Sequence, residues 1–378
     1  HKNGELHGVT FFGGAADAGV LFSWNMATNE FTKHIDFNAP PSFPDAAPIS
    51  GVNPLSGMVE VNNKFYGVTS MGGAHNEGVL YEWDPATKVY TKLHDFESGT
   101  GRYPWGEVTL LDNKLYGTTD QGGPTTGASV IYEWDLSTKT YKMWYEMDWV
   151  NGVSATGKFT YYNGKFYGVA TDGGANGFGA IFEWDPVTNV YTKKVDMTSE
   201  TGRIDGASLA LYNGKFYGGT INGGAHGAGV LFEWDPQTNV FTKKIESEPI
   251  NGMYFGSTLT LHNGKFYGIS FLGGINGVGV LFEWDPITNV YTKKIDCTFN
   301  DGYRALRSPL TFVNDKAYGL TFSGGTNDAG VLYEWDPAAN VFTPKVSFDN
   351  ANGRLAVGAL AHKNGELHGV TFFGGAAD

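Results

Sequence analysis

The residue types that most often carry out catalysis occur in this chain, but none has a recognisable catalytic spacing. The sequence contains no Gly-x-Ser-x-Gly elbow, no His-Glu-x-x-His helix, no phosphate-binding glycine loop and no Cys-x-x-Cys pair. His75 and His226 lie in loops of distant repeats, too far apart in order to share a metal. The single cysteine, Cys297, takes a position that is apolar in other repeats, so we expect a small core residue. These features favour binding over catalysis and predict no cofactor.

Oxygen-bearing side chains in equivalent loops of three repeats are the one candidate for a metal site. They are Asp17, Asn76, Glu77, Asn327 and Asp328. Calcium accepts carboxylate and amide oxygens readily, but no EF-hand spacing is present and exposed loops are commonly acidic. We therefore predict no metal, with calcium at these residues as the alternative.

Aromatic and arginine residues in the connections between repeats are the candidate contacts for a ligand or partner. Trp105 and Trp149 lie before and after the third repeat. The full set is Arg102, Tyr103, Trp105, Trp149, Tyr254, Phe255, Tyr303 and Arg304. Tryptophan, tyrosine and arginine are enriched at binding hot spots, and aromatic faces also stack on sugars. The alternative is that these loops fold inward as local caps.

Some residues differ from the residues at equivalent positions of the other repeats, and one arginine recurs at the same position in several repeats. Met143 and Trp144 replace lysines on the outermost strand, which indicates either a neighbouring domain at that edge or a merely exposed pair. Glu60 is interpreted as the charged counterpart of Thr109 on the innermost strand. Arginine recurs at one loop position, which favours a structural tie over a ring for an acidic ligand. These arginines are Arg102, Arg203 and Arg354.

The elements that position these residues follow from a repeat that fills the chain. Its landmark is an aromatic residue or histidine followed by glycine. The glycines are Gly8, Gly67, Gly117, Gly168, Gly218, Gly268, Gly319 and Gly369. The first spacing is 59 residues and the others are 50 or 51, so eight landmarks bound seven periods. A repeat that tiles a chain in this way predicts one body built of equivalent units.

The fifth repeat shows what each unit builds. Asn213-Gly214 suits a two-residue hairpin, and Asp235-Pro236 begins a second turn. Four short strands are expected, at residues 208–211, 215–221, 230–234 and 240–246. Such a meander is too small to be stable alone, so neighbouring copies must pack face to face. We therefore predict an all-β propeller of seven four-stranded antiparallel blades.

One large aromatic residue per repeat is expected to fill the space between blades. These residues are Trp24, Trp83, Trp134, Trp184, Trp234, Trp284 and Trp335. Seven identical functional sites are improbable, so their predicted role is structural. The binding face is instead expected at the glycine loops and the blade-to-blade connections, because the opposite face carries tight, uniform turns.

The two ends of the chain are predicted to build one blade together. Residues 358–362 supply the innermost strand that the first repeat lacks, which would tie the propeller at residues 1–361 shut. Residues 362–378 repeat residues 1–17 without a change. We hypothesise that they open the next propeller of a tandem array; a strand exchanged between subunits and an engineered overlap are the alternatives.

The glycine doublets, such as Gly223-Gly224, and the aromatic-Asp-Pro-x-Thr-Asn-x-aromatic signature resemble the kelch-type propeller family. The aromatic order is reversed here, as in Trp184 and Tyr191. Residues 115–123 are more similar to the glycine-rich Gloeo/Verruco-type repeat of secreted bacterial proteins. This resemblance implies a propeller along the whole chain and is nearly silent on activity.

Composition limits the partners. The formal net charge of −13 disfavours nucleic acid, and no apolar run is long enough to span a membrane. We predict a non-catalytic extracellular or cell-surface bacterial module that binds proteins or structures a larger array of propeller units, as in an adhesin or fibre. The alternatives are a lectin that binds glycans, and a hydrolase or lyase with its site on the loop face near the axis.

Overall fold

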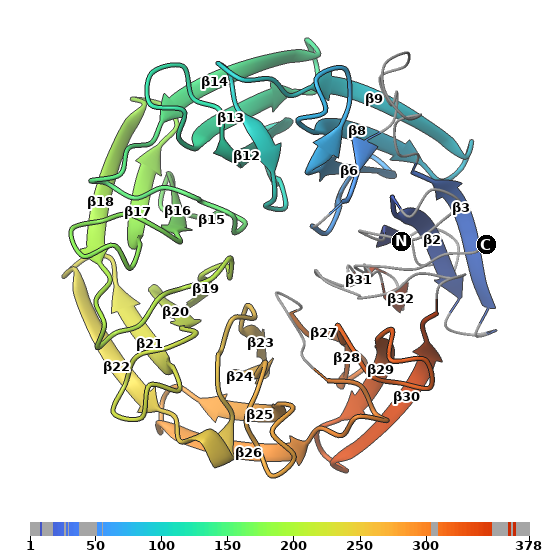
Figure 1. Ribbon diagram of the computed structural model, residues 1–378, viewed down its shortest axis with the longest axis vertical. Helices are drawn as coiled ribbons and strands as arrows, with labels where there is room; N and C mark the ends of the chain where they lie inside the picture. Colours follow the sequence, from blue (N-terminus) through green and yellow to red (C-terminus); the bar gives the residue numbers. More distant parts are fainter. Residues whose placement is uncertain are drawn as a thin grey trace. The chain divides into compact units, whose positions relative to one another are not determined.

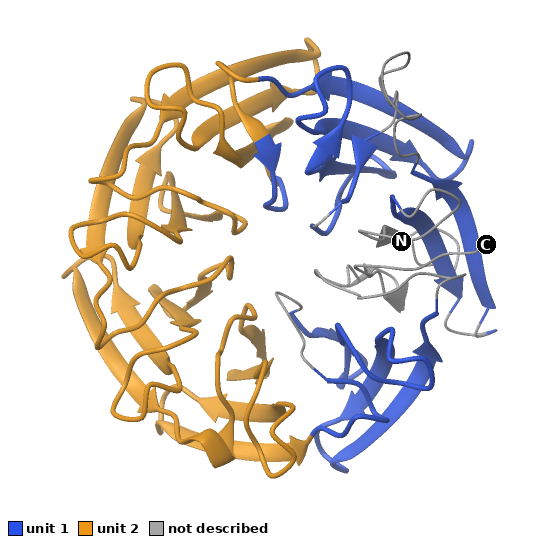
Figure 2. Cartoon of the chain, viewed as in Figure 1, with its two compact units in different colours: residues 1–97, 103–108, 297–378 blue, residues 98–102, 109–296 orange. Residues whose placement is uncertain are grey.

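The computed structural model describes residues 8–9, 18–25, 28, 30–37, 51–54, 56–303, 309–349, 362–363 and 366–367. The described elements are β-strands and one 3-10 helix, η1 (Pro249–Asn251), and no helix among them is long and apolar enough to cross a membrane. The chain divides into two compact units, coloured in Figure 2. The first unit comprises residues 1–97, 103–108 and 297–378, and the second comprises residues 98–102 and 109–296.

The second unit contains four consecutive antiparallel meanders, each in chain order (Figure 1). The first two consist of β11 (Thr109–Leu111), β12 (Lys114–Gln121), β13 (Val130–Asp135), β14 (Thr140–Glu146), β15 (Thr160–Tyr162), β16 (Lys165–Ala170), β17 (Ala180–Asp185) and β18 (Val190–Asp196). The next two consist of β19 (Ala210–Tyr212), β20 (Lys215–Gly219), β21 (Val230–Asp235), β22 (Val240–Glu246), β23 (Thr260–His262), β24 (Lys265–Ile269), β25 (Val280–Asp285) and β26 (Val290–Asp296). A further strand, β10 (Arg102–Pro104), precedes β11.

The first unit contains two complete meanders and several smaller sheets. The meanders consist of β5 (Val59–Val61), β6 (Lys64–Thr69), β8 (Val79–Asp84) and β9 (Val89–Asp95), and of β27 (Thr311–Val313), β28 (Lys316–Leu320), β29 (Val331–Asp336) and β30 (Val341–Ser347). The smaller sheets consist of β1 (Gly8–Val9), β2 (Val20–Asn25) and β3 (Glu30–Asp36), of β4 (Gly51–Val52) with β7 (Met71–Gly72), and of β31 (His362–Lys363) with β32 (Glu366–Leu367).

These sheets confirm the all-β propeller class and its four-stranded antiparallel blades, but the predicted number of seven is wrong for the described residues. Six complete meanders are present, and the first repeat forms only the three-stranded sheet β1–β2–β3. The strand expected next to β1 was predicted to come from the far end of the chain. The segment expected to supply that strand, residues 358–362, lies outside the described residues except for His362.

In the six complete meanders, a ring on the neighbouring strand requires glycine at the landmark position. A Cβ added at Gly218 would lie 2.6 Å from Cζ of Phe232, and one at Gly117 would lie 2.5 Å from the hydroxyl of Tyr132. Real Cβ atoms do not approach so closely, so only glycine fits under the ring. The period of the sequence is therefore set by an aromatic side chain on the third strand of each blade.

The Lys-Phe-Tyr-Gly sequence alternates along the second strand and so reaches two different tryptophans. Phe216 stacks on Trp234 of its own blade at 5.4 Å between ring centroids, while Tyr217 meets Trp284 of the next blade at 5.6 Å. Trp284 and Trp234 are fully buried. All seven repeat tryptophans are at most 5% exposed, which confirms their structural role. Cys297 is likewise buried.

The turns follow the predicted chemistry. Asn213 and Gly214 both have positive φ, 49° and 76°, as a two-residue hairpin requires. At the other turn, the Oδ1 atom of Asp235 accepts hydrogen bonds from the backbone N–H groups of Gln237 and Thr238. The same pattern recurs at Asp84, Asp135, Asp185, Asp285 and Asp336.

The asparagine of this turn joins one blade to the one before it. Asn239, with φ of 56°, accepts a hydrogen bond from Nε1 of Trp234 and donates one to the backbone carbonyl of Lys194 on β18. Asn189 makes equivalent bonds to Trp184 and to the carbonyl of Trp144. The Thr-Asn part of the repeat signature is thus a bridge between blades.

We expect Asn239→Gly to lower the free energy of unfolding by about 1 kcal/mol, because it removes both hydrogen bonds while glycine still accepts a positive φ. Chemical denaturation measures the change. The matched control is Lys139→Gly, at the same turn position with φ of 56°, which should be neutral or slightly stabilising. Equal losses in both variants would contradict the bridging role.

The structure corrects the position given to Glu60. In the β5–β6 pair, Val59 lies opposite Tyr66, as Thr109 lies opposite Tyr116 in the β11–β12 pair. Glu60 therefore corresponds to Leu110 and lies on the opposite strand face. A shift of one residue reverses the face on which a side chain lies, so Glu60 is not a counterpart of Thr109.

Candidate functional site

The connection between β14 and β15 carries the most exposed tryptophan in the part of the chain that the structure describes. Trp149 is 64% exposed and Val150 is 68% exposed. Because exposed apolar side chains gain contact area when a ligand covers them, this tip is the strongest candidate for a contact site.

The backbone under this tip is held firmly. The carbonyl of Trp149 accepts a hydrogen bond from the N–H of Gly174, at 2.9 Å, and the carbonyl of Val150 accepts one from Nζ of Lys193, also at 2.9 Å. The carbonyl of Asn151 accepts a bond from the hydroxyl of Tyr191. The loop is therefore anchored on the following blade, and ligand binding there would cost little ordering of the backbone.

The carboxylate of Asp148 joins the two sides of the loop at its base. Oδ1 of Asp148 accepts from the backbone N–H of Asn151 at 2.9 Å, and Oδ2 accepts from the side-chain amide of Asn151 at 2.7 Å. The carbonyl of Asp148 accepts from the N–H of Gly152. Asp148 is thus a turn-forming residue, and the tip presents apolar surface beside polar groups that are already paired.

Equivalent connections in other blades share this anchoring but present different side chains. Before β23, the carbonyl of Ile250 accepts from Lys293 and that of Asn251 accepts from Tyr291, and Ile250 is 48% exposed. In the first unit, Phe299 is 60% exposed. The blades therefore provide one repeated loop support whose tip residue varies, and β14–β15 is the connection whose tip joins a tryptophan to a second large apolar residue.

Trp105 and the residues beside it are less exposed than Trp149. Trp105 and Tyr103 are half-buried, and Tyr103 has a positive φ of 56°. Arg102 is half-buried and donates from Nη2 to Oε1 of Gln121 at 2.9 Å. Arg203 forms an ion pair with Asp172 at 2.7 Å. Both arginines have partners within the second unit, which favours the structural tie, and Arg354 lies outside the described residues.

The later connections contribute less than the sequence predicted. Phe255 is 1% exposed and packs edge-on against Phe282, so a ligand cannot reach it in this conformation. Tyr303 is buried, and its hydroxyl donates to Oδ1 of Asp328 at 3.0 Å. Tyr254 is half-buried, and Arg304 lies outside the described residues. Among the described residues of the predicted set, Trp149 is the most exposed.

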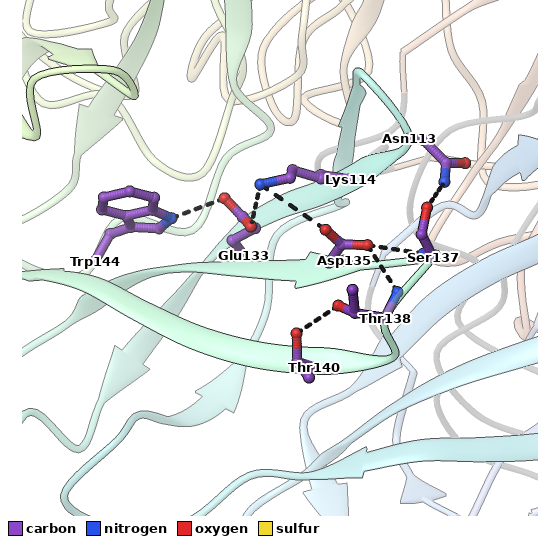
Figure 3. Close-up of polar contacts among 8 residues, drawn as sticks. All are labelled: Asn113, Lys114, Glu133, Asp135, Ser137, Thr138, Thr140 and Trp144. Carbon is purple, nitrogen blue, oxygen red and sulfur yellow. Dashed lines mark hydrogen bonds and ion pairs between the residues drawn. The ribbon is translucent and has the colours of Figure 1, made fainter.

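Trp144 is used inside the second unit, although a contact of this edge with another domain stays a prediction. Nε1 of Trp144 donates to Oε2 of Glu133 at 2.9 Å, while Lys114 pairs with Oε1 of the same carboxylate at 2.7 Å. Figure 3 draws both contacts. The ring of Trp144 also lies 6.0 Å from that of Trp184 on the next blade. Met143 beside it is half-buried. In other blades a lysine occupies the place of Trp144, for example Lys194 near Glu183 at 3.8 Å.

The carboxylate that Trp144 contacts belongs to a network that the sequence analysis missed. In the fifth repeat, Oε1 of Glu233 accepts from Lys215 at 2.7 Å and Oε2 accepts from the hydroxyl of Tyr217 at 2.8 Å. Burial alone would raise the pKa of Glu233, but these two donors outweigh it and hold the pKa below its ordinary value. The signal was present in six repeats as Lys-x-Tyr-Gly followed by Glu-Trp-Asp, whereas the first repeat has Glu5-Leu6-His7-Gly8 and Ser23-Trp24-Asn25. Recurrence of the same lysine and glutamate pair in six repeats indicates a structural network.

The predicted calcium ligands serve the glycine loops. Oδ1 of Asn76 accepts from the N–H of Gly72, and Oδ1 of Asp328 accepts from the N–H of Gly324. Asn327 donates to the carbonyl of Phe348. Glu77 lies beside Asn76 in its loop, and Asp17 is outside the described residues. Within the described ranges, no group of three or more His, Cys, Asp or Glu residues could hold a metal ion.

Comparisons with known proteins agree with the blades. A family model described as the Gloeobacter/Verrucomicrobia repeat matches residues 1–164, 42–210, 99–260 and 248–378. The kelch resemblance is not confirmed by these comparisons. Among proteins with curated descriptions, none matches the chain.

Three solved structures are similar in fold. A prolyl endopeptidase is 12% identical, with a TM-score of 0.55, and the match covers 91% of this chain and 48% of that one. The acylaminoacyl peptidase of Pyrococcus horikoshii is 10% identical, with a TM-score of 0.50, covering 92% and 51%. The β-propeller domain of the Trilobed protease from Pyrococcus furiosus is 12% identical, with a TM-score of 0.54, covering 92% and 93%. This chain spans about half the length of the first two, and such low identities show the β-propeller fold alone.

Proposed function

Because this chain belongs to the Gloeobacter/Verrucomicrobia repeat family over its whole length, we propose that it is a non-catalytic binding or structural module that engages its partner through Trp149 and Val150. The observation that carries the proposal is the exposure of 64% and 68% at two adjacent apolar residues on an anchored loop. A rigid aromatic side chain on fixed backbone supplies contact area at low entropic cost. We further propose an extracellular or cell-surface location, within a larger tandem array of propeller units.

The repeated polar groups also support a non-catalytic role. Glu133 and Glu233, whose pKa values are lowered, are each paired with a lysine inside a single blade. Catalytic sites bring different acids and bases together in one cleft. Here the six complete meanders instead repeat the same pair, whose evident effect is to hold adjacent strands of one sheet.

The partner is proposed to be a protein, with a glycan as the second candidate. The specific observation for a glycan is again Trp149, because an exposed indole face stacks on the apolar face of a sugar ring. Asn151 and Asp148 bind each other and would leave few free polar groups for a sugar. This balance favours a protein partner.

The test measures binding of the purified chain to arrays of extracellular protein domains and of glycans, before and after Trp149→Ala. We expect at least a tenfold loss of affinity, as for an aromatic hot spot, with a stability change of no more than about 0.5 kcal/mol. The control is Val187→Ala, at an 87% exposed residue in a turn at the other end of the same unit's blades. Binding that survives Trp149→Ala would exclude this tip, and silence on every glycan would remove the lectin alternative.

A further inference from the structure

A second apolar tip lies two blades after Trp149 in the second unit. Ile250, on η1, is 48% exposed, and Ile275, in the glycine loop between β24 and β25, is 72% exposed. The carbonyl of Pro249 accepts a hydrogen bond from the N–H of Gly274 at 2.9 Å. Because Ile250 and Ile275 each follow one of these bonded residues, their side chains start from adjacent backbone. These two residues are called the Ile250 tip.

The Ile250 tip has the same backbone support as the Trp149 tip, which consists of Trp149 and Val150. Nζ of Lys193 donates to the carbonyl of Val150 at 2.9 Å, and Nζ of Lys293 donates to the carbonyl of Ile250 at 3.1 Å. Both tips lie on the loop face, the end of the blades that carries the glycine loops and the blade-to-blade connections. The β19–β22 blade stands between them in the second unit (Figure 1) and is joined to both neighbours by hydrogen bonds from the turn asparagines. The two tips are therefore presented on one scaffold.

The loop face also carries exposed carboxylates near the tips. Glu200 lies at the exposed end of the connection between β18 and β19, where its carbonyl accepts from the N–H of Gly224 at 2.8 Å. Glu248 is exposed and directly precedes η1. The loop face of the second unit thus presents two apolar tips, with one carboxylate on the blade between them and another beside the Ile250 tip.

The basic residues around the tips are matched by other acids. The pairs are Lys193 with Asp196 at 2.8 Å, Lys243 with Glu246 at 3.1 Å, Lys293 with Asp296 at 2.9 Å, and Arg203 with Asp172 at 2.7 Å. Glu200 and Glu248 therefore carry negative charge beyond these pairs. The chain as a whole has a formal net charge of −13.

We propose that the loop face of the second unit binds a basic protein segment. Its apolar side chains contact the Trp149 and Ile250 tips, and its lysines or arginines lie against Glu200 and Glu248. This inference rests on the proposed function, because the Trp149 tip is one of the two apolar contacts. Each tip offers little area by itself, so a segment that spans both gains affinity from two linked contacts. Opposite charge speeds association and selects the partner, whereas an acidic segment is repelled.

The probes are labelled synthetic peptides of equal length, in which two clusters of leucine and phenylalanine are separated by lysine, serine or glutamate. Fluorescence anisotropy measures their binding to the full-length chain. We expect the lysine peptide to bind at least about tenfold more tightly than the serine peptide, and the glutamate peptide to bind more weakly than either. This preference should shrink as the salt concentration rises from about 0.05 M to about 0.5 M, because salt screens exposed charges.

Variants of the chain separate the charged contacts from the apolar ones. Glu200→Gln and Glu248→Gln should each weaken binding of the lysine peptide by about two- to fivefold and leave binding of the serine peptide unchanged. Their matched control is Asp112→Asn, which removes an exposed carboxylate from the hairpin between β11 and β12, at the other end of the blades. Ile275→Ala should weaken binding of both peptides by about three- to tenfold. Its control is Ile287→Ala, at a 68% exposed residue in the turn between β25 and β26, which should change neither.

Trp149→Ala distinguishes a failure of this inference from a failure of the proposed function. Peptide binding that Trp149→Ala leaves intact would contradict the proposed function itself. If Trp149→Ala weakens binding but lysine and serine peptides bind equally, or Ile275→Ala has no effect, the proposed function stands and the basic segment is wrong. The inference is also overturned if no peptide binds, or if Asp112→Asn reduces the lysine preference as much as Glu200→Gln does, since net charge alone would then explain it.

Discussion

Replacing Trp184 with alanine should lower the free energy of unfolding by about 3–5 kcal/mol. The side chain is fully buried, stacks on Phe166 at 5.7 Å within its blade and meets Tyr116 of the preceding blade at 5.9 Å. Its Nε1 also donates to Asn189. The substitution therefore opens a cavity between two sheets and leaves Asn189 without its donor.

Guanidinium denaturation, followed by circular dichroism, measures this loss. Trp149→Ala is the control, because it removes the same side chain from a 64% exposed position and should change stability by no more than about 0.5 kcal/mol. If Trp184→Ala also cost less than about 1 kcal/mol, the tryptophans would not be the contacts that hold neighbouring blades together.

The features that the sequence predicted correctly are those written into every repeat. The alternation around Trp234, the hairpin at Asn213-Gly214 and the turn at Asp235 each depend on a few adjacent residues. Local backbone preference and strand periodicity determine them, so one repeat is enough to recognise them. Repetition then confirms the assignment, because the same residues recur at the same spacing.

The site residues were harder to predict because their exposure depends on contacts between distant segments. Trp149 is exposed because Gly174, Lys193 and Tyr191 of the following blade bind the backbone of its loop. Phe255 lies further along its own connection, at the position of Ala155, and both residues are buried. Ile250, which corresponds to Val150, is 48% exposed. Residue type therefore did not separate tip from core, because the anchoring bonds that fix each position join segments far apart in the sequence.

Errors of register have a different origin. The repeat pattern aligns Glu60 with Thr109, whereas strand pairing aligns it with Leu110, on the opposite strand face. Trp144 was correctly aligned with the lysines of other blades, but its partner Glu133 lies on the adjacent strand. That the indole N–H of Trp144 takes the place of a lysine ammonium group beside the glutamate is evident only when the two strands are seen side by side.

The second large effect is expected for Glu233→Gln, which should lower the free energy of unfolding by about 1–3 kcal/mol at neutral pH. The carboxylate is 15% exposed and accepts from Lys215 and Tyr217, whereas a neutral amide offers weaker acceptance and an N–H that faces these donors. Because Lys215 is 40% exposed, solvent screens the ion pair, and the loss stays below that of a fully buried pair.

The pH dependence identifies the carboxylate as the cause. The pKa of Glu233 is lower in the folded protein than its ordinary value, so its contribution is complete above the unfolded pKa of about 4.3 and is lost as the pH falls through the folded value. The stability difference between wild type and Glu233→Gln should therefore be constant at neutral pH and shrink below about pH 4. Urea denaturation of both proteins between pH 7 and pH 3 measures this difference. A gap that stays constant through this range would mean that the glutamine acts by packing and not by loss of charge.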